Sequence, residues 1–223
     1  MSRFWDAAEK LVLRTPLRRT LLTAPAAAVV AEEEAAFDGL VREVDAANGA
    51  EVAYDASAAK HVFLRHLVAR RPVVLHGTGD PSISRFEPRR QTDYDNEWTD
   101  AVFATDDPIW PIFFAVVNRP VVRSLVNGCS RRYGDSHYYF SIGADPKSRE
   151  AWRSGWIYVL PRETFRRHPS GPEWLSPVAV RPLARLRVDP ADFPFIGQVV
   201  RHELGEPTGR IVVRATLGRS LRR

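Results

Sequence analysis

The side chains best placed for chemistry lie where a short apolar stretch runs into glycines. Val73-Val74-Leu75 predicts a buried strand that ends on His76, and Gly77-Thr78-Gly79 predicts a turn directly after it. An imidazole can donate or accept a proton near neutral pH, and glycine allows a ligand to approach the main chain closely. The pattern therefore indicates a site that holds a polar ligand, with a solvated turn histidine as the simpler alternative.

The segment before this strand predicts a helical arm. Apolar residues recur at helical spacing in three stretches of residues 1–70. Asn48-Gly49 is typical of a helix end, and Ser57 is a plausible N-cap because its hydroxyl can accept a bond from a free first-turn amide. We expect the three helices at 2–22, 25–47 and 57–70.

Strands dominate the sequence from residue 71 onward. One central apolar helix is expected at 109–117, after the helix-start signal Asp106-Asp107-Pro108, and another helix at 192–202. This order predicts an α+β fold, with an N-terminal helical arm at 1–70 and one domain at 71–223. The expected strands are 72–76, 101–105, 137–142, 155–160, 173–176, 184–188 and 210–215.

The composition of the chain bears on its cellular compartment and its partners rather than on a particular reaction. The chain has 223 residues, a net charge of +5 and a single cysteine, so an internal disulfide framework is excluded and a reducing, cytoplasmic compartment is expected. No apolar run approaches the roughly 20 residues that a membrane span needs. Residues 161–223 carry 12 Lys and Arg against 6 Asp and Glu, so the basic C-terminal end could meet nucleic acid or another acidic partner.

The order of these parts resembles the ADP-ribosyltransferase superfamily, in the His-Tyr-Glu branch of diphtheria-type toxins and poly-ADP-ribose polymerases. The resemblance covers residues 71–190. It consists of the strand ending in His76-Gly77-Thr78, the strand Val102–Thr105 running into an aromatic helix, and the late strand Glu173-Trp174-Leu175-Ser176. It implies a split pair of curved antiparallel sheets, a β-sandwich of the ADP-ribosyltransferase type.

The resemblance also implies roles for individual residues, with NAD as the substrate. His76 would hydrogen-bond a ribose, the backbone of Gly77 would hold the nicotinamide carboxamide, and Glu173 would stabilise the oxocarbenium-like charge as nicotinamide leaves. Thr78 is also expected at the NAD site. The family's central aromatic residue, normally Tyr, falls at Phe103. Further residues expected at the NAD site are Phe114 and Tyr94, which could supply aromatic surface, and Arg85, which could meet the pyrophosphate with Arg89 and Arg90.

Several alternatives stay open at the level of sequence. ADP-ribose could pass to water or to an unknown protein or nucleic-acid acceptor. Because Phe103 lacks the hydroxyl of Tyr, the domain could instead keep the fold as a binding module without the chemistry. An α/β-hydrolase would use His76-Gly77-Thr78-Gly79 as its oxyanion-hole segment, but its nucleophile elbow would have to be Gly134-Asp135-Ser136-His137-Tyr138, which lacks the second glycine. Glu163 is a rival acid to Glu173, although it lies after a strand.

Overall fold

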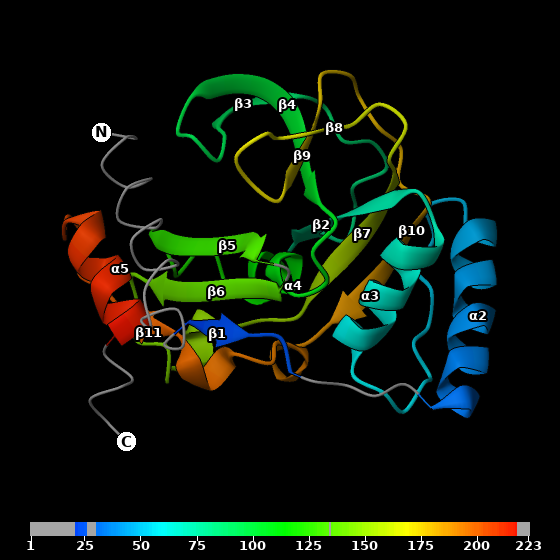
Figure 1. The fold of residues 1–223 in the computed structure, drawn as a ribbon, viewed down its shortest axis with the longest axis horizontal. Helices are drawn as coiled ribbons and strands as arrows, with labels where there is room; N and C mark the ends of the chain where they lie inside the picture. The colour runs from blue at the N-terminus through cyan, green and yellow to red at the C-terminus, as the bar shows by residue number, and fades with distance from the viewer. Residues whose placement is uncertain (1–20, 26–29, 134, 218–223) are drawn as a thin grey trace. The chain divides into compact units, whose positions relative to one another are not determined.

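The computed structural model describes residues 21–25, 30–133 and 135–217 of the chain, and the expected helix at 2–22 falls almost wholly outside them. These residues form helices and two mostly antiparallel sheets, which confirms the α+β class (Figure 1). None of the helices in this part of the chain is long and apolar enough to cross a membrane.

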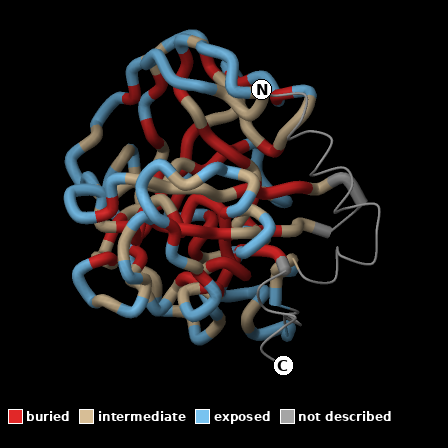
Figure 2. Tube along the Cα trace, turned by 90° about the vertical axis from the view of Figure 1, so that its left-hand side faces the viewer, coloured by how far each residue is buried: buried red, intermediate tan, exposed pale blue. Residues whose placement is uncertain are grey.

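The chain forms two compact units, which we describe separately. The larger unit comprises the described residues of 25–117 and 153–194, and the smaller unit those of 1–24, 118–152 and 195–223. In both, runs of buried residues alternate with exposed connections along the chain (Figure 2).

The larger unit contains a sheet with the strand order β10-β7-β2-β4-β9-β8, and β3 pairs with β4 as an additional hairpin strand. All of these pairs are antiparallel. The strands are β2 (Val73–Thr78), β3 (Arg89–Thr92), β4 (Trp98–Thr105), β7 (Gly155–Pro161), β8 (Arg166–Arg167), β9 (Glu173–Ser176) and β10 (Ala184–Val188).

Two helices precede this sheet and belong to the same unit. Helix α2 (Ala31–Ala46) and helix α3 (Lys60–Arg70) pack together, with the Phe37 and Phe63 ring centroids 5.6 Å apart. Asn48 and Gly49 both have positive φ directly after α2, as expected for that dipeptide at a helix end. The prediction for Ser57 was wrong, because α3 begins after Ala59 and has no side-chain cap.

The sheet has two different faces. One face carries an apolar cluster formed by Val74, Phe86, Val102, Ala104, Tyr158, Leu160, Phe165 and Val180. The other face of β2 and β7 is covered by helix α4 (Trp110–Val116). The Asp107 carboxylate accepts bonds from the Ile109 and Trp110 amides, at 2.9 and 2.8 Å, and so caps the start of this helix.

The smaller unit is built on the hairpin of β5 (Leu125–Tyr133) and β6 (Asp135–Ile142). The short strands β1 (Leu22–Thr23) and β11 (Val200–Arg201) pair with β6, antiparallel and parallel respectively. Helix α5 (Thr208–Leu217) packs against β5 and β6. The 3₁₀ turns η2 (Arg149–Ala151) and η4 (Ile196–Gln198) also lie here, whereas η3 (Pro190–Asp192) lies in the larger unit.

Three sequence-based predictions were wrong in their element type. Residues 210–215, expected as a strand, are part of α5, where Ile211 and Ala215 are buried at helical spacing. Residues 192–202, expected as a helix, contain the end of η3, the 3₁₀ turn η4 and the strand β11 instead of an α-helix. Gly77 and Thr78 form no turn, because β2 continues through them and pairs them with Ile157 and Trp156.

Candidate functional site

The three strands that carry the predicted site are consecutive neighbours in the larger unit. β2, with His76, lies beside β4, with Phe103, and β4 lies beside β9, with Glu173. β2 and β4 share only the register pair Leu75–Thr105, whereas β2 pairs with β7 along its whole length. The sheet therefore divides between β2 and β4 beyond Leu75, and the edge of β2 that follows has no partner on β4.

His76 bridges this division with its ring. Its Nδ1 lies 2.7 Å from the carbonyl oxygen of Phe103. A carbonyl oxygen only accepts, so Nδ1 carries the proton and a neutral ring presents Nε2 as an acceptor. Burial lowers the pKa of His76 below its ordinary value, partly offset by the bond to Phe103, which favours the neutral ring at pH 7. No partner of Nε2 is recorded among the described residues.

The His76 ring packs against the apolar cluster, which fixes its position. Its centroid lies 4.8 Å from the ring of Phe86, which itself packs edge-on against Tyr158 at 5.1 Å. The Tyr158 hydroxyl donates to the Asp80 carbonyl at 2.9 Å and accepts from the Ile83 amide at 3.1 Å. One buried tyrosine thus supports the histidine through Phe86 and fixes the loop that follows β2.

We expect Tyr158→Phe to destabilise the protein by about 1–3 kcal/mol, because the Ile83 amide and the Asp80 carbonyl would both lose their partner. Tyr54→Phe is the matched control, since the half-buried Tyr54 hydroxyl makes a single recorded bond, to Ala58. Urea unfolding gives the two free energies, and hydrogen exchange at the Ile83 amide should accelerate only in the Tyr158 variant. Equal losses in the two variants would contradict this role for Tyr158.

One oxygen of the Glu173 carboxylate has no hydrogen-bond partner among the described residues. The residue is half-buried at the start of β9, and this oxygen, Oε2, is itself buried. The pKa of Glu173 is raised from 4.5 to about 7, mainly by burial and also by the charges of Asp93 and Asp95, although a bond from the Tyr94 amide opposes the shift. A carboxyl group with this pKa exists in both protonation states near neutral pH.

This raised pKa couples stability to pH. Between pH 4.5 and 7 the unfolded chain loses the Glu173 proton while the folded chain keeps it, so the contribution of Glu173 to stability falls as pH rises through this window. Glu173→Gln removes the titration. We expect the melting temperature of the variant, relative to the parent, to increase between about pH 5 and about pH 8 in thermal unfolding scans. The same difference at both pH values would show that Glu173 is not buried in this way.

The tip of the β3–β4 hairpin folds onto the start of β9. The Tyr94 ring lies against Gly171, where a Cβ atom would come within 2.3 Å of that ring. Ser170 Oγ donates to Asp95 Oδ2 at 2.8 Å, and His168 Nε2 lies 3.5 Å from Asp93 Oδ2. The segment 79–100 thus contains this hairpin and places Tyr94 beside Glu173.

Phe103 shares a face of the sheet with Glu173. The β4–β9 register pairs Phe103 with Leu175 and Thr105 with Glu173. Paired residues, and residues two apart on a strand, project from the same face. Phe103 and Leu175 are both half-buried, so this face offers apolar surface next to the carboxylate.

Two arginines extend this face with positive charge. Arg89 pairs with Ala101 and Arg166 pairs with Leu175, so both project from the same face as Phe103. The charge of Arg89 also lowers the pKa values of His76 and Asp80, which places it within electrostatic reach of both. Arg85, the arginine singled out from the sequence, is instead exposed and paired with Glu87 at 2.8 Å.

Arg153 is a site residue that the sequence analysis missed. Its guanidinium lies directly against Gly79, where a Cβ atom would be only 1.7 Å from Nη2. Its Nε is buried with no hydrogen-bond partner among the described residues. No motif could have indicated this arginine, because it reaches the loop after β2 from a position 74 residues later in the chain.

The structure places the other predicted residues in mainly structural surroundings. The Cα of Gly77 lies against the main chain of Pro111 in α4. The Thr78 hydroxyl accepts a bond from the Asp80 amide at 3.2 Å. The half-buried Phe114 packs on Trp110 and Phe113 within α4, and no contact between its ring and His76 or Glu173 is recorded in the described part of the chain.

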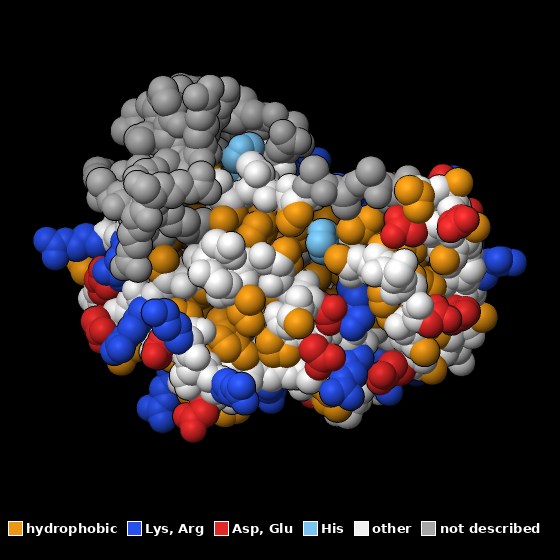
Figure 3. Space-filling view, turned by 90° about the horizontal axis from the view of Figure 1, so that it is seen from below, with side chains coloured by type: hydrophobic (Ala, Val, Ile, Leu, Met, Phe, Trp, Pro, Cys, Tyr) orange, Lys and Arg blue, Asp and Glu red, His pale blue; other side chains and the backbone are white. Residues whose placement is uncertain are grey.

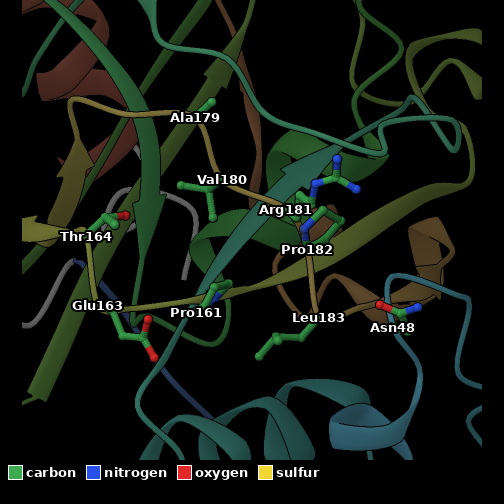
Figure 4. Close-up of a pocket in the computed structure, with 9 residues that line it drawn as sticks. All are labelled: Asn48, Pro161, Glu163, Thr164, Ala179, Val180, Arg181, Pro182 and Leu183. Atoms are coloured by element: carbon green, nitrogen blue, oxygen red, sulfur yellow. The ribbon is translucent and has the colours of Figure 1, made fainter.

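A shallow pocket of about 340 Å³ lies elsewhere in the larger unit (Figure 4). Its walls come from the end of β7, from the segments after β7 and before β10, and from Asn48. Five of the nine lining residues are proline or apolar, and two are charged. Glu163, the rival acid, lines this pocket and is exposed. The pocket does not include His76, Phe103 or Glu173.

Several arginines in the described part of the basic C-terminal end form ion pairs. Arg185, Arg187, Arg201 and Arg214 each lie within 4 Å of a carboxylate of the same unit. On the face shown in Figure 3, Lys and Arg side chains are interspersed with Asp and Glu. Nucleic acid as an acceptor stays a prediction from composition.

The nucleophile elbow of the hydrolase alternative is not formed around Ser136. This serine lies on β6, which begins at Asp135, and its hydroxyl accepts a bond from Arg131 Nε at 3.2 Å. An elbow requires a sharp turn between a strand and a helix.

Comparisons with protein-family models, curated proteins and solved structures found no match to the chain.

Proposed function

We propose that the protein has an ADP-ribosyltransferase-like fold and cleaves the bond between nicotinamide and ribose in NAD. ADP-ribose would pass to water or to a nucleophilic group of a macromolecule. The observation that carries this proposal is Glu173, a half-buried carboxylate with one free oxygen, on the same sheet face as the half-buried ring of Phe103. The division of the sheet next to His76 fits the split sheets of that superfamily.

The reaction needs a negative charge where a positive charge develops. As the glycosidic C–N bond breaks, its electron pair leaves with nicotinamide and the ribose gains oxocarbenium character. The ionised Glu173 stabilises this charge, and because its oxygen is already desolvated it needs little reorganisation. The incoming nucleophile then attacks the same ribose carbon and releases a proton, which restores neutrality at the sugar.

The remaining contacts of NAD would come from both faces of the sheet. Because Leu75 pairs with Thr105, His76 projects from the face opposite to Glu173, so NAD would meet both through the division between β2 and β4. His76 Nε2 accepts a hydrogen bond from a ribose hydroxyl, because the proton on Nδ1 is already donated to the Phe103 carbonyl oxygen. The Phe103 ring provides a flat apolar surface for nicotinamide. Arg89 and Arg153 carry the positive charge required by a diphosphate, and the buried Arg153 Nε still has a hydrogen to donate.

A binding module without catalysis is the second candidate, favoured by two observations. Phe103 supplies no hydroxyl, and the Tyr94 amide already donates a hydrogen bond to the Glu173 carboxylate. Such a protein would bind NAD through His76 and the arginines without releasing nicotinamide.

Two measurements on the purified chain separate these outcomes. Nicotinamide release is measured by mass spectrometry after incubation with NAD, and NAD binding is measured by calorimetry. Release supports the enzyme, and binding without release supports the module. If NAD neither binds nor releases nicotinamide, the proposed function is wrong.

A further inference from the structure

A second set of chemistry-bearing side chains lies in the smaller unit, far from Glu173 in sequence. Ser124 directly precedes β5, Ser141 lies on β6, and His202 directly follows β11. His202 Nδ1 lies 2.8 Å from Ser141 Oγ, and His202 Nε2 lies 2.9 Å from Ser124 Oγ. The strand pairings that bring these residues together are those of β6 with β5 and with β11 (Figure 1).

The number of protons on each group determines which atom donates in the bonds of Ser141, His202 and Ser124. Ser141 Oγ donates its single proton to the Val200 carbonyl at 3.1 Å, so it accepts from His202 Nδ1. The neutral His202 ring then has its lone pair on Nε2, and Ser124 Oγ donates to it. The order is nucleophile, base and orienting acceptor, the relation found in serine acyl-transfer sites.

The charge state of His202 suits a base. Burial lowers the pKa of His202, whereas the carboxylates of Glu206 and Glu203 raise it and the Arg214 guanidinium lowers it. Arg214 is itself paired with Glu206 at 2.7 Å. The imidazole is therefore neutral, and able to accept the Ser124 proton, across the neutral pH range.

Access to Ser124 comes past a glycine. Ser124 is half-buried and Gly143 is exposed beside it. A Cβ atom at position 143 would lie 3.0 Å from Ser124 Cβ and 3.5 Å from His202 Nε2. Gly143 does not have a positive φ, so the absence of a side chain is not needed for its backbone. The missing side chain of Gly143 instead leaves the approach to Ser124 and the His202 ring open.

We propose that Ser124 is a reactive nucleophile for small activated carboxylic or phosphonic esters, with His202 as its base and Ser141 as the residue that orients the base. Ser124 Oγ forms a bond to the acyl carbon or phosphorus, and its proton passes to His202 Nε2. The bond to the leaving alkoxide, phenoxide or fluoride breaks, and the leaving group takes up that proton. Water hydrolyses an acyl-enzyme by the same proton route in reverse.

Labelling of the full chain with a fluorophosphonate probe tests the proposal. Peptide mass spectrometry should find the adduct on Ser124, and His202→Gln should reduce the labelling rate by about 10²–10⁴-fold, the usual contribution of a positioned base. Ser154→Ala is the matched control, because the Ser154 hydroxyl bonds a carboxylate of Asp189 and no histidine. Its labelling should equal that of the parent.

The outcomes are separable from folding and from the NAD site. Ser141→Ala leaves both reacting side chains in place, so a smaller fall in rate than in His202→Gln, measured in the folded variant, supports the orienting role. Gly143→Val should slow a bulky probe more than a small one. No adduct on Ser124 in the folded parent, or equal labelling in a folded His202→Gln variant, overturns the proposal. Neither result depends on NAD.

Discussion

Nicotinamide release from NAD is expected to fall by about 10²–10³-fold in Glu173→Gln, the usual effect of removing one group that stabilises transition-state charge. Gln has nearly the same shape as Glu, so it can keep the contact with the Tyr94 amide through its carbonyl oxygen. It carries no charge, and its amide dipole cannot oppose an oxocarbenium ion to the same extent. The loss should therefore appear in kcat rather than in KM, as measured by mass spectrometry of released nicotinamide.

The matched control is Glu163→Gln, which removes a carboxylate from the exposed pocket of Figure 4 and not from the β4–β9 face. Its rate should equal that of the parent. Calorimetry with NAD should give similar affinities for all three proteins, because the contacts proposed for ribose, nicotinamide and diphosphate do not involve Glu173 in the ground state. A Glu173 variant with parental activity would remove Glu173 from the mechanism, and a loss confined to KM would make it a binding group.

The dependence of this rate on pH gives an independent check. In the proposed mechanism the ionised form of Glu173 is the active one, and the pKa of Glu173 is about 7. The parent rate should therefore increase with pH and level off above that value. The residual rate of the Gln variant should lack this step.

Local sequence patterns were sufficient for elements with a clear period. Helix α2 follows from Phe37, Leu40, Val41 and Val44 on one side and from Asn48-Gly49 at its end, and β10 follows from alternating apolar residues and arginines. The same rules failed at 210–215, where Ile-Val-Val has a β preference but the burial of Ile211 and Ala215 requires a helix. Packing determined the outcome there, because propensities are weaker than burial.

The candidate site was predictable only in the residues that lie on strands. His76 and Glu173 are placed by β2 and β9, both of which the sequence indicates. The Tyr94–Gly171 contact, the reach of Arg153 to Gly79 and the choice of Arg89 over Arg85 depend on how separate loops fold against each other. No pattern within one segment carries that information. The Ser124–His202–Ser141 set is a further example, since its members are brought together only by strand pairing in the smaller unit.

Gly77 shows how a residue can be singled out correctly for a different physical reason. The resemblance implies that its backbone holds a ligand, and the unpaired edge of β2 beyond Leu75 permits this. The structure adds a packing requirement that the sequence does not reveal. A Cβ atom at Gly77 would lie 1.8 Å from the Pro111 carbonyl oxygen and 2.6 Å from its carbon. On the neighbouring strand β7, a Cβ atom at Gly155 would likewise lie 2.0 Å from the Ala115 carbonyl oxygen.

We therefore expect Gly77→Ala to destabilise the protein by about 1–3 kcal/mol or more, the range for overpacking a rigid interior. The obstructing atoms belong to the main chain of α4, so they cannot rotate away, and the helix itself must shift from β2. Because α4 also covers β7, the shift should propagate to the strand that pairs with β2. Urea unfolding of the parent and the variant gives the loss directly.

Gly39→Ala and Gly197→Ala are the matched controls, because a Cβ atom at either position has nothing within 4 Å and neither glycine has a positive φ. Gly39 lies inside α2, where Ala should stabilise by about 0.5–1 kcal/mol through helix propensity. A Gly77 variant as stable as these controls would show that α4 does not approach β2 this closely. A stable Gly77 variant that no longer binds NAD would assign the glycine to the ligand instead, whereas loss of stability before any change in NAD affinity assigns it to the contact between α4 and β2.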